Sequence, residues 1–318
     1  MLCRQGGEHS ESVELSEISE VIADPANLVW VDVRKPTTED FDLLKEEFDF
    51  HPLALEDAAK RSQRPKLDSY ENHHLLVFYS VEFDVENMRI NEHELAVFIG
   101  DNYLVTVHHG SVPEIETLSQ RWMHTFNLPR TSVGVLLYHL LDMIVDDYPP
   151  VLDAVAECTD AVETRIFDSF DPTAQRDVFT LRKELLNFRR VLGPERDVML
   201  RLTHTDLPML DDGTAIYFQD VYDHVVRATD SVDLYRDLLN SALDAYLSLS
   251  SNSLNATVRR LTSVSIILMS LSLIAGIYGM NFENMPELTT RYGYFVVLGF
   301  MVVLAASLGL YFRRRRWL

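Results

Sequence analysis

The stretch from position 261 to 312 decides the fold, and it reads LTSVSIILMSLSLIAGIY (261–278), GMNFENMPELTTRYG (279–293) and YFVVLGFMVVLAASLGLYF (294–312). The first and third segments carry no charged side chain. Each is long enough to cross a hydrocarbon core of about 30 Å as a helix that rises ~1.5 Å per residue. The segment between them is too short and too polar to be anything other than a turn outside the bilayer. We therefore predict a two-helix transmembrane hairpin that follows a large soluble domain.

Arginines flank the two apolar segments on the side away from the turn. Arg259 and Arg260 precede the first segment, and the basic tail 313–318 begins with arginines. The turn contains a single basic residue, Arg291. Positively charged flanks stay in the cytoplasm, which predicts two cytoplasmic termini and an extracytoplasmic loop at 279–293. The alternative, two buried helices of a globular core, would place these arginines by coincidence. We expect a multi-pass protein of the cell membrane, either inner or plasma.

The turn also contains a specific combination of short motifs. Gly279-Met280-Asn281 stands at the end of a span and is followed by Met285-Pro286-Glu287-Leu288. This combination resembles the CorA family of magnesium channels. Further segments that look like the family are His51-Pro52-Leu53-Ala54-Leu55-Glu56-Asp57, Arg64-Pro65-Lys66, Tyr70-Glu71-Asn72 and Tyr217-Phe218-Gln219-Asp220-Val221-Tyr222-Asp223-His224. The resemblance covers nearly the whole chain and implies a funnel-shaped homo-oligomer, a homopentamer if it follows the family. Met-Pro-Glu-Leu favours the magnesium-type branch over the zinc-transporting relatives.

The chain is strongly acidic, with a formal net charge of −21. Only five of its 28 basic residues are lysines, and acidic surfaces poor in lysine suit a cytoplasm of very high salt, where charge repulsion is screened. Two interpretations stay open: a halophilic source, or a cation-handling protein that is simply acidic. The sign of the charge argues against nucleic acid as a partner. Cys3 and Cys158 are far apart in the sequence, so no zinc cluster is expected.

Residues 1–130 have the pattern of a cytoplasmic α/β domain with a mixed sheet. Apolar, β-branched and aromatic residues predict strands at 28–33, 75–83, 95–99 and 103–108, the last two joined as a hairpin through Gly100. Residues 37–61 have helical spacing, with Thr37 or Thr38 as the N-cap and a break at His51-Pro52.

From position 113 onward the pattern is helical. We predict helices at 113–126, 131–170 and 172–202, and a cytoplasmic helical region over 131–213 that closes with a break at 206–213. The next helix meets no glycine or proline before Gly276, which predicts a stalk helix over 214–278 that continues into the first span and is about 95 Å long. The predicted fold class is thus an α+β cytoplasmic domain, a very long stalk helix and a two-helix transmembrane hairpin.

Two faces of the predicted stalk carry regular patterns. Apolar residues recur with a period near 3.5, which suits helices that lie side by side. They are Tyr217, Val221, Val225, Ala228, Val232, Tyr235, Leu239, Ala242, Tyr246 and Leu249. Aspartates recur every seven residues, at Asp223, Asp230, Asp237 and Asp244. In a ring of parallel stalks each would form a ring of carboxylates that concentrates cations, with Asp237 and Asp244 at the cytoplasmic entrance. The alternative is an ordinary solvated face of an acidic protein.

A third face runs from the stalk into the first span and carries small, hydroxyl and apolar residues at i+3 and i+4 spacing. Its members are Asn255, Val258, Leu261, Ser265, Met269, Ser272 and Gly276. The same positions line the pore in the CorA family. Leu261 and Met269 would narrow such a pore to a hydrophobic gate that closes by dewetting. The alternative is ordinary small-residue packing between membrane helices.

Neither span contains Asp, Glu, His, Lys or Arg, so an ion inside the bilayer would meet only neutral groups. Mg²⁺ gives up its water reluctantly and prefers oxygen ligands. We therefore expect a hydrated ion at the mouth, held by the Asn281 amide and by the carbonyls of Gly279 and Met280. The resemblance makes this asparagine the selectivity filter. Glu283 and Glu287 would raise the cation concentration outside, and the family offers a loop-stabilising role for Glu287 as the alternative.

The resemblance also implies regulation by cytoplasmic Mg²⁺, bound between subunits by paired carboxylates. Asp84 and Asp220 fall at the corresponding positions. Acidic interfaces would repel each other until a divalent ion bridges them. No lysine has the Gly-Lys-Ser/Thr context of a Walker loop, so we expect neither ATP-driven pumping nor an organic cofactor.

Taken as a whole, the sequence predicts a passive, Mg²⁺-gated channel and not an enzyme. It would import hydrated Mg²⁺, with Co²⁺ and Ni²⁺ as further candidates, down the membrane potential and under negative feedback from cytoplasmic Mg²⁺. Three alternatives are zinc transport by the same fold, a membrane-anchored divalent-cation sensor without a pore, and a hydrolase on the α/β domain. The sensor leaves the hydroxyl-bearing face and Asn281 without a role, and no Gly-x-Ser-x-Gly or metal-ligand motif supports the hydrolase.

Overall fold

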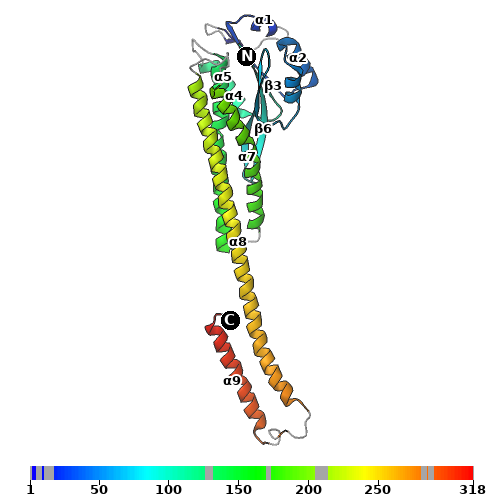
Figure 1. The fold of residues 1–318 in the computed structure, drawn as a ribbon, viewed down its shortest axis with the longest axis vertical. Coiled ribbons are helices and arrows are strands. Elements are labelled where there is room, and N and C mark those ends of the chain that lie inside the picture. The colour runs from blue at the N-terminus through cyan, green and yellow to red at the C-terminus, as the bar shows by residue number, and fades with distance from the viewer. Residues whose placement is uncertain are drawn as a thin grey trace. The chain divides into compact units, whose positions relative to one another are not determined.

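The computed structural model of the chain describes residues 2–4, 9–10, 18–125, 132–169, 173–204, 214–280, 285 and 290–317. The chain divides into two compact units, Met1–Ala242 and Leu243–Leu318, and each is considered by itself. The first unit contains a sheet and most of the helices (Figure 1). The second unit contains the C-terminal part of a long helix and one further helix.

The first unit is built on a mixed sheet, as the sequence predicted. Within the described residues its strand order is β2-β1-β3-β7-β6-β5-β4. The strands are β1 (Leu2–Arg4), β2 (His9–Ser10), β3 (Asn27–Arg34), β4 (Lys66–Ser69), β5 (His74–Asp84), β6 (Arg89–Ile99) and β7 (Tyr103–His108). β3 and β7 pair in parallel, and the other pairs are antiparallel. The sequence pattern missed β1, β2 and β4. β4 buries only Leu67, so it has no apolar alternation.

Helices cover both faces of this sheet, and the central strands are therefore buried on both sides. Figure 1 shows α2 (Thr38–Phe48) on one side of the strands and α5 (Val133–Asp146) on the other. On the α2 side, Phe50 stacks on Phe98 with 4.1 Å between ring centroids. β7 is buried along its whole length. This two-sided core explains why continuous apolar runs, and not only alternating ones, marked the strands.

The predicted break between two short helices at His51-Pro52 is present. α2 begins after Thr37, whose hydroxyl accepts a hydrogen bond from the Asp40 backbone N–H at 3.3 Å, while the Asp40 carboxylate accepts one from the Thr37 N–H at 2.7 Å. This reciprocal capping selects Thr37 over Thr38 as the N-cap. α3 (Pro52–Ala59) starts with proline at its first position, where no helical N–H bond is lost.

The helical part of the first unit corrects one prediction. α4 (Pro113–Thr125) and α7 (Ala174–His204) match the expected helices, and α1 (Ile18–Ile22) is an additional short one. The single helix expected over 131–170 is divided into α5 and α6 (Tyr148–Thr164), and a π-helical turn, Arg165–Ser169, follows. The reason is the Pro149-Pro150 pair, which removes two backbone donors from the carbonyls four residues earlier and so ends α5 at Asp146.

Two helices complete the edge of the sheet where β4 stops. β4 pairs with β5 only as far as Val77, so the outward-facing backbone of Tyr79 has no strand partner there. The Tyr79 N–H donates to the carboxyl of Glu195 on α7 at 3.0 Å, and the Tyr148 hydroxyl of α6 donates to the Tyr79 carbonyl at 2.7 Å. Buried backbone groups need such partners. Side chains of α6 and α7 therefore take the place of a missing strand.

The predicted stalk is one helix, α8 (Ala215–Tyr278), of 64 residues. At ~1.5 Å per residue it is about 95 Å long. Within the first unit its apolar seam is buried against the same chain: Val221, Val225 and Val232 are fully buried. The Phe218 ring lies edge-on to Tyr138 of α5 at 6.3 Å, and Asp233 pairs with Arg189 of α7 at 2.6 Å. The last helix is α9 (Gly293–Arg314).

Candidate functional site

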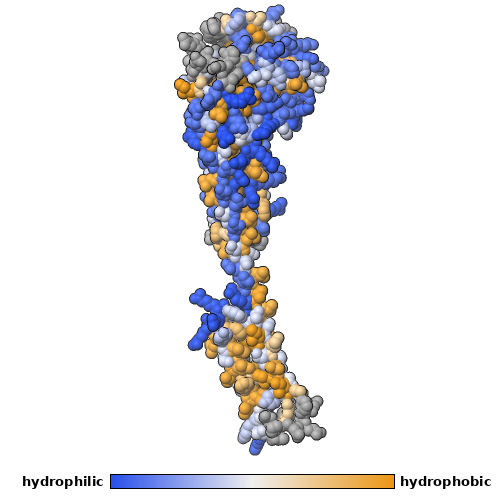
Figure 2. Space-filling model, viewed as in Figure 1, coloured by the Kyte–Doolittle hydropathy of each residue, from blue (hydrophilic) through white to orange (hydrophobic). Residues whose placement is uncertain are grey.

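The second unit contains two apolar helical segments. Within the described residues, α8 and α9 are the helices long and apolar enough to cross a membrane. Only 6% of each apolar segment is buried, and a core helix of a soluble domain would be mostly buried. Figure 2 shows the hydrophobic surface that they present. Both segments therefore need an apolar surrounding other than the chain itself.

Aromatic and basic residues mark the C-terminal end of α9. The Arg315 guanidinium lies 5.7 Å from the centre of the Tyr311 ring, and the Phe312 and Trp317 rings stack at 5.7 Å. Such aromatic residues beside arginines are typical of the boundary between hydrocarbon and water. The predicted second span, 294–312, ends among these residues.

Each of the two helices has one less exposed face. On α8 this face contains the buried Ser263 and the half-buried residues Ile267, Ser270, Leu271 and Ile274. On α9 it contains Val297, Met301, Leu304, Leu308 and the buried Phe312. These are positions at i+3 and i+4 spacing, so each set lies along one side of its helix. The remaining sides of both helices are exposed in the single chain.

The predicted pore-lining residues of α8 lie opposite its less exposed face. At 3.6 residues per turn, Leu261, Ser265 and Ser272 are about 160–200° around the helix from Ser263. All seven predicted residues are exposed: Asn255, Val258, Leu261, Ser265, Met269, Ser272 and Gly276. A Cβ added to Gly276 would meet nothing within 4 Å. The structure thus brings the predicted set together as one open strip.

The hydroxyl groups of this strip differ in their hydrogen bonding from those elsewhere on α8. Thr262 and Ser270, away from the centre of the strip, donate to backbone carbonyls of their own helix at 2.8 Å. In the described part of the chain, the Ser265 and Ser272 hydroxyls have no hydrogen-bond partner. They are therefore available to water or to a hydrated ion.

The C-terminal end of α8 presents backbone carbonyls. The Gly279 N–H donates to the Ala275 carbonyl at 2.9 Å, and the Met280 N–H donates to the Ile277 carbonyl at 3.3 Å. Carbonyls at the end of a helix carry partial negative charge, which attracts cations. A Cβ at Gly279 would lie 3.1 Å from the Ala275 oxygen, so a larger residue would disturb this end. The remaining predicted mouth residues, Asn281, Glu283 and Glu287, lie outside the described residues.

The stalk aspartates form an exposed acidic line on α8. Asp223, Asp230, Asp237 and Asp244 are all exposed. Within the described residues none of these four lies within ion-pair distance of an arginine or lysine. Asp233, which lies between Asp230 and Asp237 along α8, pairs with Arg189 and Arg236, and the Arg189 hydrogen bond lowers its pKa. The Gln219 amide donates to Asp223 at 3.1 Å, and no described arginine or lysine neutralises the charge of these four aspartates.

The two predicted regulatory aspartates are placed differently from each other. Asp84 ends β5 and accepts hydrogen bonds from the side chain and backbone N–H of Asn87, at 2.7 and 3.1 Å, which lowers the pKa of Asp84. Asp220 lies near the start of α8, with 4.0 Å between its carboxylate and the His224 ring. In the part of one chain that the structure describes, no contact joins Asp84 to Asp220.

The structure instead places Asp220 beside two aspartates of α5. Asp142, Asp146 and Asp220 form what we call the α5–α8 carboxylate cluster. Burial raises the pKa of Asp142, and the negative charges of Asp146 and Asp220 raise it further. His224 lies 3.4 Å from Asp146. The described residues of one chain contain no group of three or more His, Cys, Asp or Glu side chains that could hold a metal ion. Sequence reasoning missed this cluster, although the i, i+4 spacing of Asp142 and Asp146 was visible.

The fold and these helices define a membrane protein. An α+β domain continues through one long helix into a pair of exposed apolar helices. The strip on α8 is hydroxyl-bearing and uncharged within the span, which is the surface that a passage for a hydrated cation would require.

Comparison with known proteins identifies the family. Residues 25–314 match the family described as CorA-like Mg²⁺ transporter protein. YfjQ of Bacillus subtilis (strain 168) is 34% identical over 288 residues, which cover 91% of this chain and 89% of that protein. The cobalt/magnesium transport protein CorA of Thermotoga maritima is 33% identical over 272 residues, covering 85% and 78%. The solved CorA magnesium transporter of Methanocaldococcus jannaschii matches with a TM-score of 0.82 at 25% identity, covering 98% and 95%. The chain belongs to the CorA family, and the predicted fold class is confirmed.

Proposed function

We propose that this protein is a passive channel for hydrated Mg²⁺, assembled from identical chains, five if it follows its family. The observation that carries the proposal is the open strip on α8, which is uncharged within the span and lies opposite the helix's less exposed face. Several copies arranged around an axis would cover these strips from lipid and turn them toward a shared column of water. The two spans, with the arginine flanks inside, would place both termini in the cytoplasm of a cell-membrane protein.

The strip suits an ion that keeps its water. The free hydroxyls of Ser265 and Ser272 and the amide of Asn255 can exchange hydrogen bonds with a hydration shell. Leu261 and Met269, both strongly exposed, would narrow the passage and close it by dewetting. At the outer end, the carbonyls of Gly279 and Met280 would join the Asn281 amide as the selectivity filter, with Glu283 and Glu287 nearby.

The driving force would be the membrane potential. It is worth ~2.3 kcal/mol per charge per 100 mV, hence about twice that for Mg²⁺. On the cytoplasmic side, Asp237 and Asp244 would hold divalent cations near the entrance. Co²⁺ and Ni²⁺, which are also divalent cations, are proposed as further cargo.

Negative feedback would come from cytoplasmic Mg²⁺ bound between subunits. We assign Asp84 and Asp220 to this regulation, with Asp220 supported by the α5–α8 carboxylate cluster. Burial and the negative charges of Asp146 and Asp220 raise the pKa of Asp142, and a bound divalent cation would relieve the same repulsion. Occupation of such interfaces would hold the subunits together in a closed arrangement, and loss of Mg²⁺ would release them.

The test is ion flux in proteoliposomes that contain a Mg²⁺-sensitive dye. Asn281→Ala should reduce Mg²⁺ uptake by about tenfold or more, because a hydrogen bond to a charged hydration shell is lost. Asn187→Ala is the matched control, since Asn187 lies on α7 in the first unit and outside both spans. Unchanged uptake in Asn281→Ala would refute the role of Asn281 as the selectivity filter. No Mg²⁺ uptake by the wild type would refute the channel and favour the alternative, a membrane-anchored divalent-cation sensor without a pore. Parallel runs with Co²⁺, Ni²⁺ and Zn²⁺ separate magnesium transport from zinc transport.

A further inference from the structure

A cavity of about 580 Å³ lies between α7 and the sheet, at the loop that leads into β4. Its lining contains Arg64, Arg189, Arg190 and Arg196 and only one acidic residue, Asp197. In a chain with a net charge of −21, such a wall is exceptional. All its lining residues belong to the first unit.

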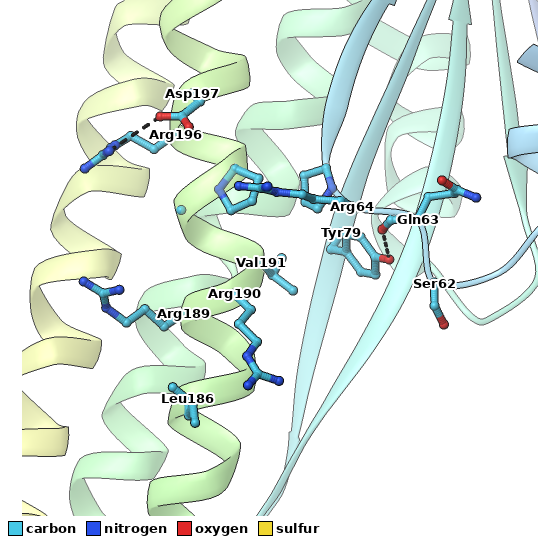
Figure 3. A pocket seen from close by; sticks show the side chains of 13 residues that line it. Ser62, Gln63, Arg64, Tyr79, Leu186, Arg189, Arg190, Val191, Arg196 and Asp197 are labelled. Atoms are coloured by element: carbon cyan, nitrogen blue, oxygen red, sulfur yellow. Dashed lines mark hydrogen bonds and ion pairs between the residues drawn. The ribbon is translucent and has the colours of Figure 1, made fainter.

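The four arginines are not equivalent. Arg189 is held by Asp233 of α8 through two hydrogen bonds, at 2.6 and 3.1 Å, and Arg196 lies 3.5 Å from Asp197. Within the described residues, Arg64 and Arg190 have no carboxylate within ion-pair distance. Figure 3 shows Arg64 reaching from the β4 side toward α7 and Arg190 pointing into the space between α7 and the strands, whereas Arg189 and Arg196 point the other way. The cavity thus has two positive charges without a carboxylate partner, one carried by the loop before β4 and one by α7.

The loop that carries Arg64 is fixed in place. The Glu94 carboxylate accepts hydrogen bonds from the backbone N–H groups of Ser62 and Gln63, at 2.5 and 3.0 Å, and the Tyr79 hydroxyl donates to the Gln63 carbonyl at 2.5 Å. After the loop, Lys66 pairs with Asp57 and Asp68 at 2.6 Å. A guanidinium on a fixed loop loses little freedom when it binds a ligand.

The opposite wall departs from good helix sequence at the cavity. Gly193 and Pro194 stand together inside α7, and they are the two residue types least favourable in a helix interior. A Cβ built at Gly193 would meet nothing within 4 Å, so this position opens onto free space. Residues that are unfavourable for the local secondary structure are found most often at functional sites. Here the glycine keeps the cavity open beside Arg190.

The fully buried carboxyl next to this dipeptide does not oppose an anion. Glu195 follows this dipeptide and is fully buried, and burial raises its pKa to about 8. At neutral pH it is mostly protonated and therefore uncharged.

We propose that this cavity binds a phosphorylated small molecule of nucleotide size, with the phosphate held between Arg64 and Arg190. The planar guanidinium matches phosphate oxygens in paired hydrogen bonds. The cavity volume falls within the ~300–1,000 Å³ of small-molecule sites and is far larger than phosphate alone requires. Pro65, Tyr79, Leu186, Val191 and Pro194 form the apolar wall for the rest of the ligand. This site is independent of the proposed ion passage.

The test is isothermal titration calorimetry on the full-length protein in detergent at low salt and fixed free Mg²⁺. The probes are ADP, AMP, inorganic phosphate and, as the uncharged control, adenosine. We expect saturable binding of ADP or AMP, at least about tenfold weaker binding of adenosine, and a loss of affinity of about tenfold for each of Arg64→Gln and Arg190→Gln. Arg182→Gln, an exposed arginine on α7 outside the cavity, should bind as the wild type does.

A steric variant tests the same site with both charges intact. Gly193→Leu should fill the cavity and abolish binding, whereas Gly193→Ala should retain it. The two variants should unfold at similar temperatures, because both add a Cβ to the helical residue before Pro194. The proposal is wrong if no phosphorylated probe binds, or if binding survives both Gly193→Leu and the double arginine variant. If inorganic phosphate bound as tightly as ADP, the proposal that the ligand is of nucleotide size would be wrong. Because ion flux is not measured, these outcomes do not depend on the channel.

Discussion

Glu195 makes a specific prediction about how stability depends on pH. Its carboxyl is fully buried, accepts the Tyr79 N–H at 3.0 Å and lies 3.0 Å from the Tyr148 hydroxyl, which itself donates to the Tyr79 carbonyl. A protonated Glu195 satisfies this geometry, because its O–H can donate to the Tyr148 oxygen. Glu195→Gln should reproduce it, since the glutamine oxygen can accept from Tyr79 and the amide N–H can donate to Tyr148.

The magnitude follows from the pKa. Burial raises the pKa of Glu195 from 4.5 to about 8, and the negative charge of Glu92 adds to the increase. Between these values the folded protein holds a proton that the unfolded chain has released, so stability falls as pH rises through this window and is constant above it. At 1.36 kcal/mol per unit, the whole window corresponds to at most about 5 kcal/mol, and pH 6 to 8 to about 2–3 kcal/mol. For a unit of this size that is a shift of roughly 5–10 °C.

The assay is thermal unfolding of the detergent-purified protein from pH 5.5 to 8.5, followed by the fluorescence of Trp30 and Trp122, which are buried in the first unit. The midpoint temperature of unfolding of the wild type should fall as pH rises, and that of Glu195→Gln should fall markedly less. Glu195→Ala should be destabilised by ~1–3 kcal/mol at every pH, because it leaves the buried Tyr79 N–H unsatisfied. Equal pH dependence in the wild type and Glu195→Gln would refute the assignment of the proton to this carboxyl.

Three further predictions concern α8 and the helices packed against it. A double-mutant cycle on Arg189 and Asp233, both partly exposed, should give a coupling of only ~0.5–1 kcal/mol in unfolding measurements, and a much larger value would mean that the pair is shielded from solvent. Asp244→Asn should lower flux at low Mg²⁺ concentration but not at saturation, and the difference should vanish in ~1 M salt, where the Debye length is about 3 Å. Persistence of the difference in high salt would exclude an electrostatic role. Asp142→Asn should raise the unfolding temperature in EDTA and reduce the extra stabilisation by Mg²⁺, since burial and neighbouring charge raise the pKa of Asp142. An unchanged Mg²⁺ effect would remove the α5–α8 carboxylate cluster from regulation.

The fold could be predicted wherever the signal is local. The α8 helix, its apolar end and α9 follow from hydropathy and from the lack of glycine or proline before Gly276. The start of α2 follows from the Thr37 cap. The α5–α6 boundary was also encoded locally, in Pro149-Pro150, but the surrounding apolar period concealed it. β4 was beyond reach, because a four-residue strand becomes one only by pairing with β5.

The residues of the candidate site also fall into two groups: those that local sequence predicts and those that only the packing of distant segments brings together. The strip from Asn255 to Gly276 was predictable, because helical periodicity alone decides which residues share a side. The α5–α8 carboxylate cluster was not, since Asp142 and Asp220 are far apart in the sequence and meet only when α8 packs on α5. The free arginines of the α7 cavity were equally hidden, because a sequence does not say which arginine finds an aspartate.

What the amino-acid sequence determined by itself is the set of elements that depend on a residue's immediate neighbours: the spans, the long helix, its faces and its caps. Hydropathy, backbone sterics and helical periodicity act over a few residues and need no partner. The tertiary structure alone decided the partners: Glu195 against the free edge of β5, Arg189 with Asp233, and the empty space left beside Gly193. These depend on side chains brought together from distant segments, and only the packing of the whole unit sets their distances, their burial and their charge.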